Sequence, residues 1–153
     1  MSRPDRSKVE LIEASEHLFY EFSMFMGLAR LQATGAFGES LVNNALLESF
    51  TIHARVLLYF LYSENPRPDD VIAEDFLDDT DVWHSTRPNK SSKLNSVHQR
   101  VGKEVAHLTY ARHDVTPETK KWYFIDIANE VEEIFKQFIN LVPPELLCDY
   151  WKS

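Results

Sequence analysis

The sequence is poor in cysteine, glycine and basic residues. Its 153 residues include one cysteine and four glycines. There are 16 Lys and Arg residues against 24 Asp and Glu residues, so the formal net charge is -8. A single cysteine, Cys148, excludes an intramolecular disulfide, and its apolar neighbours Leu147 and Trp151 favour a packing role. The negative charge argues against a broad, non-specific nucleic-acid surface, which needs clustered Lys and Arg, but it allows a small basic cleft.

Long apolar runs and strand signals are also missing. No run of about 18 apolar residues indicates a transmembrane helix. The first residues include basic side chains but no apolar core of a secretory signal. We therefore expect a soluble, cytoplasmic protein with no membrane partner. No strand-length alternation or Asn-Gly hairpin dipeptide occurs, and the length fits a single domain, residues 1–153, around one core.

Apolar residues instead recur at intervals of three and four, which predicts amphipathic helices. The first helix has Ser7 as N-cap, with Glu10 completing a capping box, and Gly35 follows its end. Thr116 and Pro117 are typical of the start of the last helix. The second helix is apolar on most sides and should lie at the centre. The four predicted helices cover residues 7–32, 40–62, 91–112 and 117–141.

The segment between the second and third helices, residues 63–93, is too long for a plain connection. Pro66 and Pro68 end the second helix, and Asp69 or Asp70 can cap a short helical piece after them. The fold class we predict is all-α, an up-down four-helix bundle with a long lid-like insertion between helices 2 and 3. A C-terminal helical turn, residues 144–151, should dock on the bundle.

Two groups of residues suggest metal binding, and for both a plainer interpretation is favoured. His53 lies on the apolar face of the second helix, where a hydrogen-bonded core histidine is the commoner case. The insertion contains several acidic residues and His84, but their spacing matches neither an EF-hand nor HExxH, so a solvated acidic loop is favoured. We predict no metal and no cofactor. His17, His98 and His113 are interpreted as solvated or capping residues.

The third predicted helix carries the side chains best suited to chemistry. In an α-helix Arg100 and His107 lie two turns apart and differ by only about 20° around the axis, with Glu104 between them. Histidine suits proton transfer near neutral pH, and arginine binds phosphate through two parallel hydrogen bonds. The pair is therefore half of a site for metal-independent RNA cleavage, which a symmetric dimer would complete. Glu104 can also form an ion pair with Arg100 and occupy it.

The segment RVGKEVAH, on the third helix of a small predicted bundle, contains an Arg, six intervening residues and a His. This spacing resembles the signature of the HEPN family. That resemblance implies a homodimeric, metal-independent RNA endonuclease of the toxin-antitoxin or phage-defence type, with an RNA substrate and, in a toxin-antitoxin system, an antitoxin partner. Arg100 and His107 would be catalytic, and Lys103 and Glu104 would bind substrate or support the pair. The alternative is a non-catalytic interaction or nucleotide-sensing module of the same fold, in which these residues form a structural polar rim.

Overall fold

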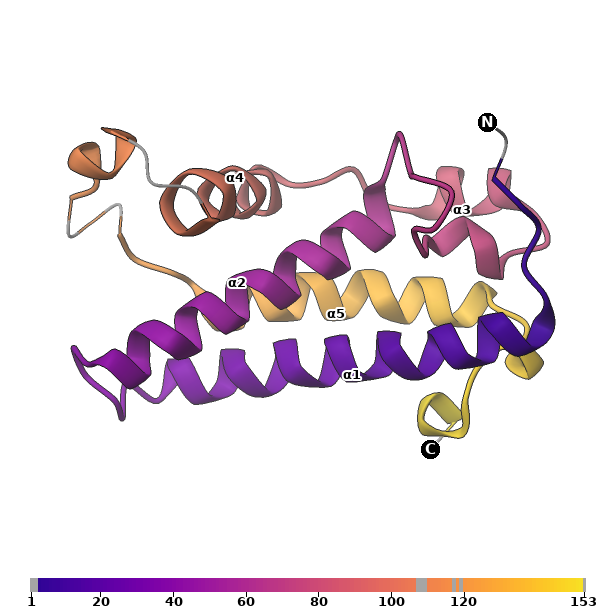
Figure 1. Ribbon diagram of the computed structural model, residues 1–153, viewed down its shortest axis with the longest axis horizontal. Coiled ribbons are helices and arrows are strands. Elements are labelled where there is room, and N and C mark those ends of the chain that lie inside the picture. Colours follow the sequence, from indigo (N-terminus) through magenta and orange to yellow (C-terminus); the bar gives the residue numbers. More distant parts are fainter. Residues whose placement is uncertain (1–2, 107–109, 117, 119, 153) are drawn as a thin grey trace.

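The computed structural model describes residues 3–106, 110–116, 118 and 120–152, and this part of the chain contains helices and no strand. The prediction of an all-α protein is confirmed. Five α-helices are joined by loops and short turns (Figure 1). They are α1 (Lys8–Ala33), α2 (Leu41–Tyr62), α3 (Thr80–Thr86), α4 (Ser92–Arg100) and α5 (Phe124–Leu141). Short 3-10 turns cover Ala73–Phe76, Tyr110–Asp114, Pro144–Leu146 and Asp149–Lys152.

The first two helices start and stop where the sequence predicts. The Ser7 hydroxyl accepts a hydrogen bond from the Glu10 N–H at 3.3 Å, and the Glu10 carboxylate accepts one from the Ser7 N–H at 2.8 Å. After Ala33 the chain turns through Gly35, whose φ of 65° lies in the left-handed region that favours glycine. Ser40 caps α2 by accepting from the Asn43 N–H at 3.2 Å.

Three long helices, α1, α2 and α5, lie side by side, and α4 is seen nearly end-on above α2 in Figure 1. The core between them is rich in aromatic rings. Phe60 of α2 lies 5.2 Å from Phe138 of α5 between ring centroids, and Phe25 of α1 lies 5.0 Å from Phe50 of α2. The aromatic contacts hold the three helices around one core.

The insertion, residues 63–93, contributes to that core and does not lie over it as a separate flap. Phe76 and Trp83 are fully buried, and their rings lie 6.1 and 5.6 Å from that of Phe138. Trp83 belongs to α3, a helix that was not predicted; Asp79 caps it by accepting from the Asp81 N–H at 3.0 Å. The prediction of a lid therefore missed that two large apolar side chains in the acidic segment need burial.

The second half of the molecule departs from the predicted helix boundaries. The third helix does not run as α-helix to residue 112: α4 ends at Arg100, and Val101–Ala106 forms a π-helical turn, the π segment. The fourth helix begins at Phe124 instead of residue 117, and Pro117 itself lies outside the described residues. Ahead of α5, the Lys120 N–H donates to the Thr116 carbonyl at 2.8 Å.

The C-terminal turn docks on α1, as predicted. Ser15 of α1 accepts from the Cys148 N–H through its hydroxyl at 2.7 Å, and its carbonyl accepts from the Trp151 indole N–H at 2.9 Å. Cys148 is buried, which confirms its packing role. The Trp151 ring lies over Phe135 of α5 at 6.1 Å, so the turn closes one end of the core.

Among the described helices, α2 has the length and hydropathy of a membrane-spanning segment, although no uninterrupted apolar run was found in the sequence. Only 44% of its most apolar 18-residue window is buried against the rest of the chain. Glu48 and Arg55 lie near its middle, where charged side chains are unfavourable in a bilayer. Core helices of soluble proteins can have the same length and hydropathy, and α2 packs against α1 and α4.

Candidate functional site

Arg100, the first candidate catalytic residue, is the last residue of α4. The helix starts at Ser91, whose hydroxyl accepts from the Leu94 N–H at 3.1 Å. Leu94 and Val97 are buried, and Val101 continues their apolar side into the π segment. Because this side faces α2, Arg100 projects from the flank of the helix, where its side chain is only 18% exposed.

Each nitrogen of the Arg100 guanidinium group donates a hydrogen bond within the chain. Nε donates to the two carboxylate oxygens of Glu104 at 3.1 and 3.0 Å, which confirms that Glu104 pairs with Arg100. Nη1 donates to the Lys121 carbonyl at 2.9 Å, and Nη2 donates to the Lys120 carbonyl at 3.2 Å. The side chain therefore ties the end of α4 to the segment that leads into α5.

Trp122 covers one face of the same guanidinium group. The Arg100 Cζ atom lies 3.9 Å from the centre of the indole ring, within the range of a cation–π interaction. The indole in turn contacts Phe50 of α2 at 6.3 Å between ring centroids. Arg100 is thus held between a carboxylate, two carbonyls and an aromatic ring. These contacts hold the guanidinium group in one orientation.

The structure brings together only some of the predicted site residues. Arg100 and Glu104 are in contact, Lys103 is exposed on the π segment, and His107 lies outside the described residues. The expected alignment of Arg100 with His107 assumed a continuous α-helix. In residues 101–106 the backbone is π-helical, with i to i+5 hydrogen bonds and more residues per turn, so the α-helical register does not hold there.

A large concave surface lies elsewhere, between α1 and α2. This α1–α2 groove has a volume of about 1070 Å³. Leu11 and Leu18 of α1 and Phe60 of α2 are buried along its apolar lining. Ile52, Val56 and Tyr59 of α2 also line the groove and are 57, 40 and 37% exposed. The charged side chains on its walls include Glu13, Glu48, Arg55 and Asp69. An apolar trough with mixed charges on its walls suits an amphipathic ligand.

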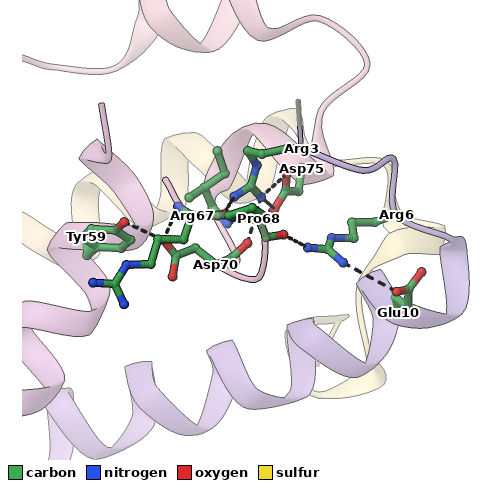
Figure 2. Close-up of polar contacts among 9 residues, drawn as sticks. Arg3, Arg6, Glu10, Tyr59, Arg67, Pro68, Asp70 and Asp75 are labelled. Carbon is green, nitrogen blue, oxygen red and sulfur yellow. Dashed lines mark hydrogen bonds and ion pairs between the residues drawn. The ribbon is translucent and has the colours of Figure 1, made fainter. Parts of the chain in front are cut away.

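Two N-terminal arginines fix the loop at one end of the groove (Figure 2). Arg3 Nη2 donates to both carboxylate oxygens of Asp75 at 2.8 and 2.6 Å and to the Asp70 carbonyl at 2.8 Å. Arg3 Nη1 donates to the Arg67 carbonyl at 2.6 Å. Arg6 donates to the Pro68 carbonyl. The N-terminal arm therefore holds the loop after α2 in place, and this fixes the shape of the groove.

Tyr59 fixes the same loop from α2. Its hydroxyl donates to a carboxylate oxygen of Asp70 at 2.6 Å, and the Arg67 N–H donates to the same oxygen at 2.6 Å. These two hydrogen bonds lower the pKa of the Asp70 carboxyl group below its ordinary value, and the bond from Tyr59 has the larger effect. Asp70 therefore stays charged when the pH falls into the range where an ordinary aspartate takes up a proton.

His53 is a hydrogen-bonded core histidine, as predicted. It is buried, and its Nδ1 atom lies 2.5 Å from a carboxylate oxygen of Glu21 on α1. The Tyr20 ring meets the imidazole edge to face at 5.9 Å. The contact joins α1 to α2 beside the groove and satisfies the polar side chain without a ligand.

Within the described ranges, no group of three or more His, Cys, Asp or Glu side chains is placed to hold a metal ion. The acidic residues of the insertion have other partners. Asp75 binds Arg3, Asp79 caps α3, and Glu74 lies 2.9 Å from His84 Nε2. These contacts account for most of the acidic pattern that had suggested cation binding.

His98 lies on the exposed side of α4 and faces cations. Burial lowers its pKa below 6.5, and the positive charges of Lys90 and Arg55 lower it further. Arg55 belongs to α2 and also lines the groove. From the sequence, His98 was expected to be a solvated or capping residue. Its relation to Arg55 has no local signal, because helix packing brings the two elements together.

The groove was not predicted from the sequence. Because most residues of α2 are apolar, this helix was expected at the centre of the bundle, with no apolar face left for binding. The available signal was the placement of Glu48 and Arg55 seven residues apart on one face, with Ile52 between them. Two charges flanking an apolar residue are typical of a face that reaches the surface.

Fold and site together define an all-helical protein with an open, amphipathic groove between its two longest helices. Comparison of the chain with protein-family models, with curated proteins and with solved structures gave no match. Its function is therefore inferred from its own geometry.

Proposed function

We propose that this chain is a non-catalytic interaction module that binds an amphipathic helix in the α1–α2 groove. The observation that carries the proposal is the apolar face of α2 inside that groove. Ile52, Val56 and Tyr59 are spaced by four and three residues, so they form one stripe along about two helical turns. Grooves of this type bind a helix through side chains at the same i, i+3, i+4 and i+7 spacing.

The contacts of Arg100 support the non-catalytic part of the proposal. A catalytic arginine presents its N–H groups to the substrate, whereas Arg100 uses an N–H of each of its three nitrogens to bind Glu104 or a carbonyl. The stacking on Trp122 adds to the cost of releasing it. The contacts account for Arg100 as a residue that joins α4 to α5.

A display selection tests the binding proposal. Random helical peptides are selected on immobilised wild-type protein, with the Ile52→Asp/Val56→Asp variant as counter-target. We expect enriched peptides with apolar residues at i, i+4 and i+7 that bind the wild type at least tenfold more tightly than this variant. Leu41→Asp is the matched control, because Leu41 is exposed on α2 outside the groove. If no peptide separates wild type from the groove variant, the proposal fails.

The HEPN-like endonuclease is the second candidate, and the π segment is the observation that favours it. π-Helical turns occur frequently at functional sites, and this one lies between Arg100 and His107. On this proposal the fold is a variant of the up-down four-helix bundle with an insertion at 63–93. Two subunits would bring Arg100 and His107 together on RNA in the cytoplasm, and an antitoxin would restrain them.

RNA cleavage in EDTA separates the two candidates. The nuclease proposal expects metal-independent cutting that Arg100→Ala and His107→Ala both abolish, whereas Lys103→Ala and Glu104→Ala change it less. The interaction module expects no cutting by any of these proteins. Folding of each variant is checked by circular dichroism, because loss of Arg100 also removes structural contacts.

A further inference from the structure

The exposed face of α2 carries a heptad pattern. Ala45, Glu48, Ile52, Arg55 and Tyr59 follow one another at spacings of three and four, and all five are exposed. This spacing is that of residues a and d in helices that pack along one another. Ile52, with 57% of its surface exposed, lies at the centre of the pattern. We call this face the α2 seam.

The two charges of the α2 seam are opposite and symmetric about its centre. Glu48 and Arg55 lie seven residues apart, so they point in nearly the same direction about two turns, or roughly 10 Å, apart. Neither forms an ion pair within the described part of the chain. The midpoint between them falls beside Ile52.

We propose that the α2 seam binds the α2 seam of a second copy of this chain, with the two helices antiparallel. A two-fold axis beside Ile52 places each Glu48 next to Arg55 of the other copy, which makes two equivalent ion pairs around an apolar centre. A parallel arrangement would instead place Glu48 against Glu48 and Arg55 against Arg55. The charge pattern therefore selects both the partner and its direction.

This inference names the partner of the groove in the proposed function and rests on it. A lipid bilayer would also cover Ile52 and Tyr59, but it would have to accommodate Glu48 and Arg55 near the middle of the same face. An unrelated helix would need a complementary pair of charges at the same spacing. A second copy supplies that pair by symmetry.

Charge exchange between the two positions tests the pairing. Glu48→Arg places Arg opposite Arg, and Arg55→Glu places Glu opposite Glu, so each single variant should dissociate. An equimolar mixture of the two variants, however, forms a heterodimer in which both pairs are again opposite in charge. Sedimentation velocity over a wide range of protein concentrations measures all three samples, with Arg30→Glu on α1 as a control that has the same charge change as Arg55→Glu.

We expect the wild type and Arg30→Glu to dimerise alike, each single variant to dissociate on the order of tenfold more readily, and the mixture to return to the wild-type value. High salt should weaken the wild-type dimer, because mobile ions screen the attraction between Glu48 and Arg55 of the two copies. A monomeric wild type, or single variants that dimerise unchanged, would overturn the inference. If the wild type stays monomeric yet selected peptides bind the groove, the interaction module stands and only self-association fails.

Discussion

The guanidinium carbon of Arg100 lies 3.9 Å from the centre of the Trp122 ring, and this contact joins two segments that the sequence places in separate helices. Arg100 ends α4, and Trp122 lies two residues before the first residue of α5. The carbonyls of Lys120 and Lys121 accept hydrogen bonds from the same guanidinium group. Arg100, for which the HEPN resemblance implies a catalytic role, thus connects the end of α4 to the segment before α5.

Arg100→Ala should lower the free energy of unfolding by about 2 kcal/mol, since it removes a partly buried charged hydrogen-bond donor and its aromatic contact. Arg100→Lys should recover only part of this loss, because an ammonium group cannot reach Glu104 and both carbonyls at once. Urea unfolding measures both variants. Arg30→Ala, at an exposed position on α1, serves as the control. An Arg100→Ala variant as stable as Arg30→Ala would contradict the structural role.

Trp83→Ala should destabilise the protein by about 3 to 5 kcal/mol, because it leaves a cavity beside Phe138. The size of the effect distinguishes an insertion that belongs to the core from one that lies over it. Tyr123→Ala removes an aromatic side chain that is 60% exposed and should cost much less. Equal losses in thermal unfolding for the two variants would argue that α3 is only loosely attached.

Arg3→Gln should free the loop at the end of the groove. The substitution removes the two bonds to Asp75 and weakens those to the carbonyls of Arg67 and Asp70. Amide hydrogen exchange in residues 67–75 should become faster, whereas exchange in α5 should not change. Arg67→Gln is the matched control, because the loop uses the backbone of Arg67 (Figure 2). Unchanged exchange in Arg3→Gln would show that the arm does not hold the loop.

The lowered pKa of His98 predicts a loss of stability in mild acid. As the pH falls through 6.5, the ordinary value, the unfolded chain takes up a proton at this position before the folded chain does. Stability therefore falls with pH until the lowered folded-state pKa is reached. His98→Gln should reduce the difference between urea midpoints at pH 7.5 and pH 5.5.

Proton NMR of the His98 ring gives the direct measurement of the same shift. In the wild type the ring should titrate below 6.5, and Arg55→Gln should raise its pKa only in part, because burial is the larger cause. A His98 ring that titrates at or above 6.5 would remove the basis of this prediction.

Local sequence signals predicted the ends of α1 and α2 well. Ser7, Glu10, Gly35 and Ser40 act through their own backbone or that of residues within one turn, so their effect is readable without tertiary structure. The pairing of Glu104 with Arg100 was predicted for the same reason, because residues four apart on a helix are neighbours.

The third and fourth helices were predicted less well because distant contacts decide their boundaries. A 3.6-residue pattern runs through residues 91–112, yet the backbone changes to a π-helical turn after Arg100. Arg100 binds carbonyls about 20 positions further along the chain, and those carbonyls are available only because α5 starts at Phe124. No local sequence pattern predicts the contact between Arg100 and these carbonyls.

The sequence by itself determined the all-helical class, the single apolar core and the caps of the first two helices, since spacing and capping act over a few residues. Only the tertiary structure decided that Trp83 is buried, that Arg100 is bound by carbonyls and Trp122, and that α2 keeps an exposed face. Burial and hydrogen bonding at these residues depend on which segments far apart in the chain meet. These long-range contacts are determined by the packing of the whole core.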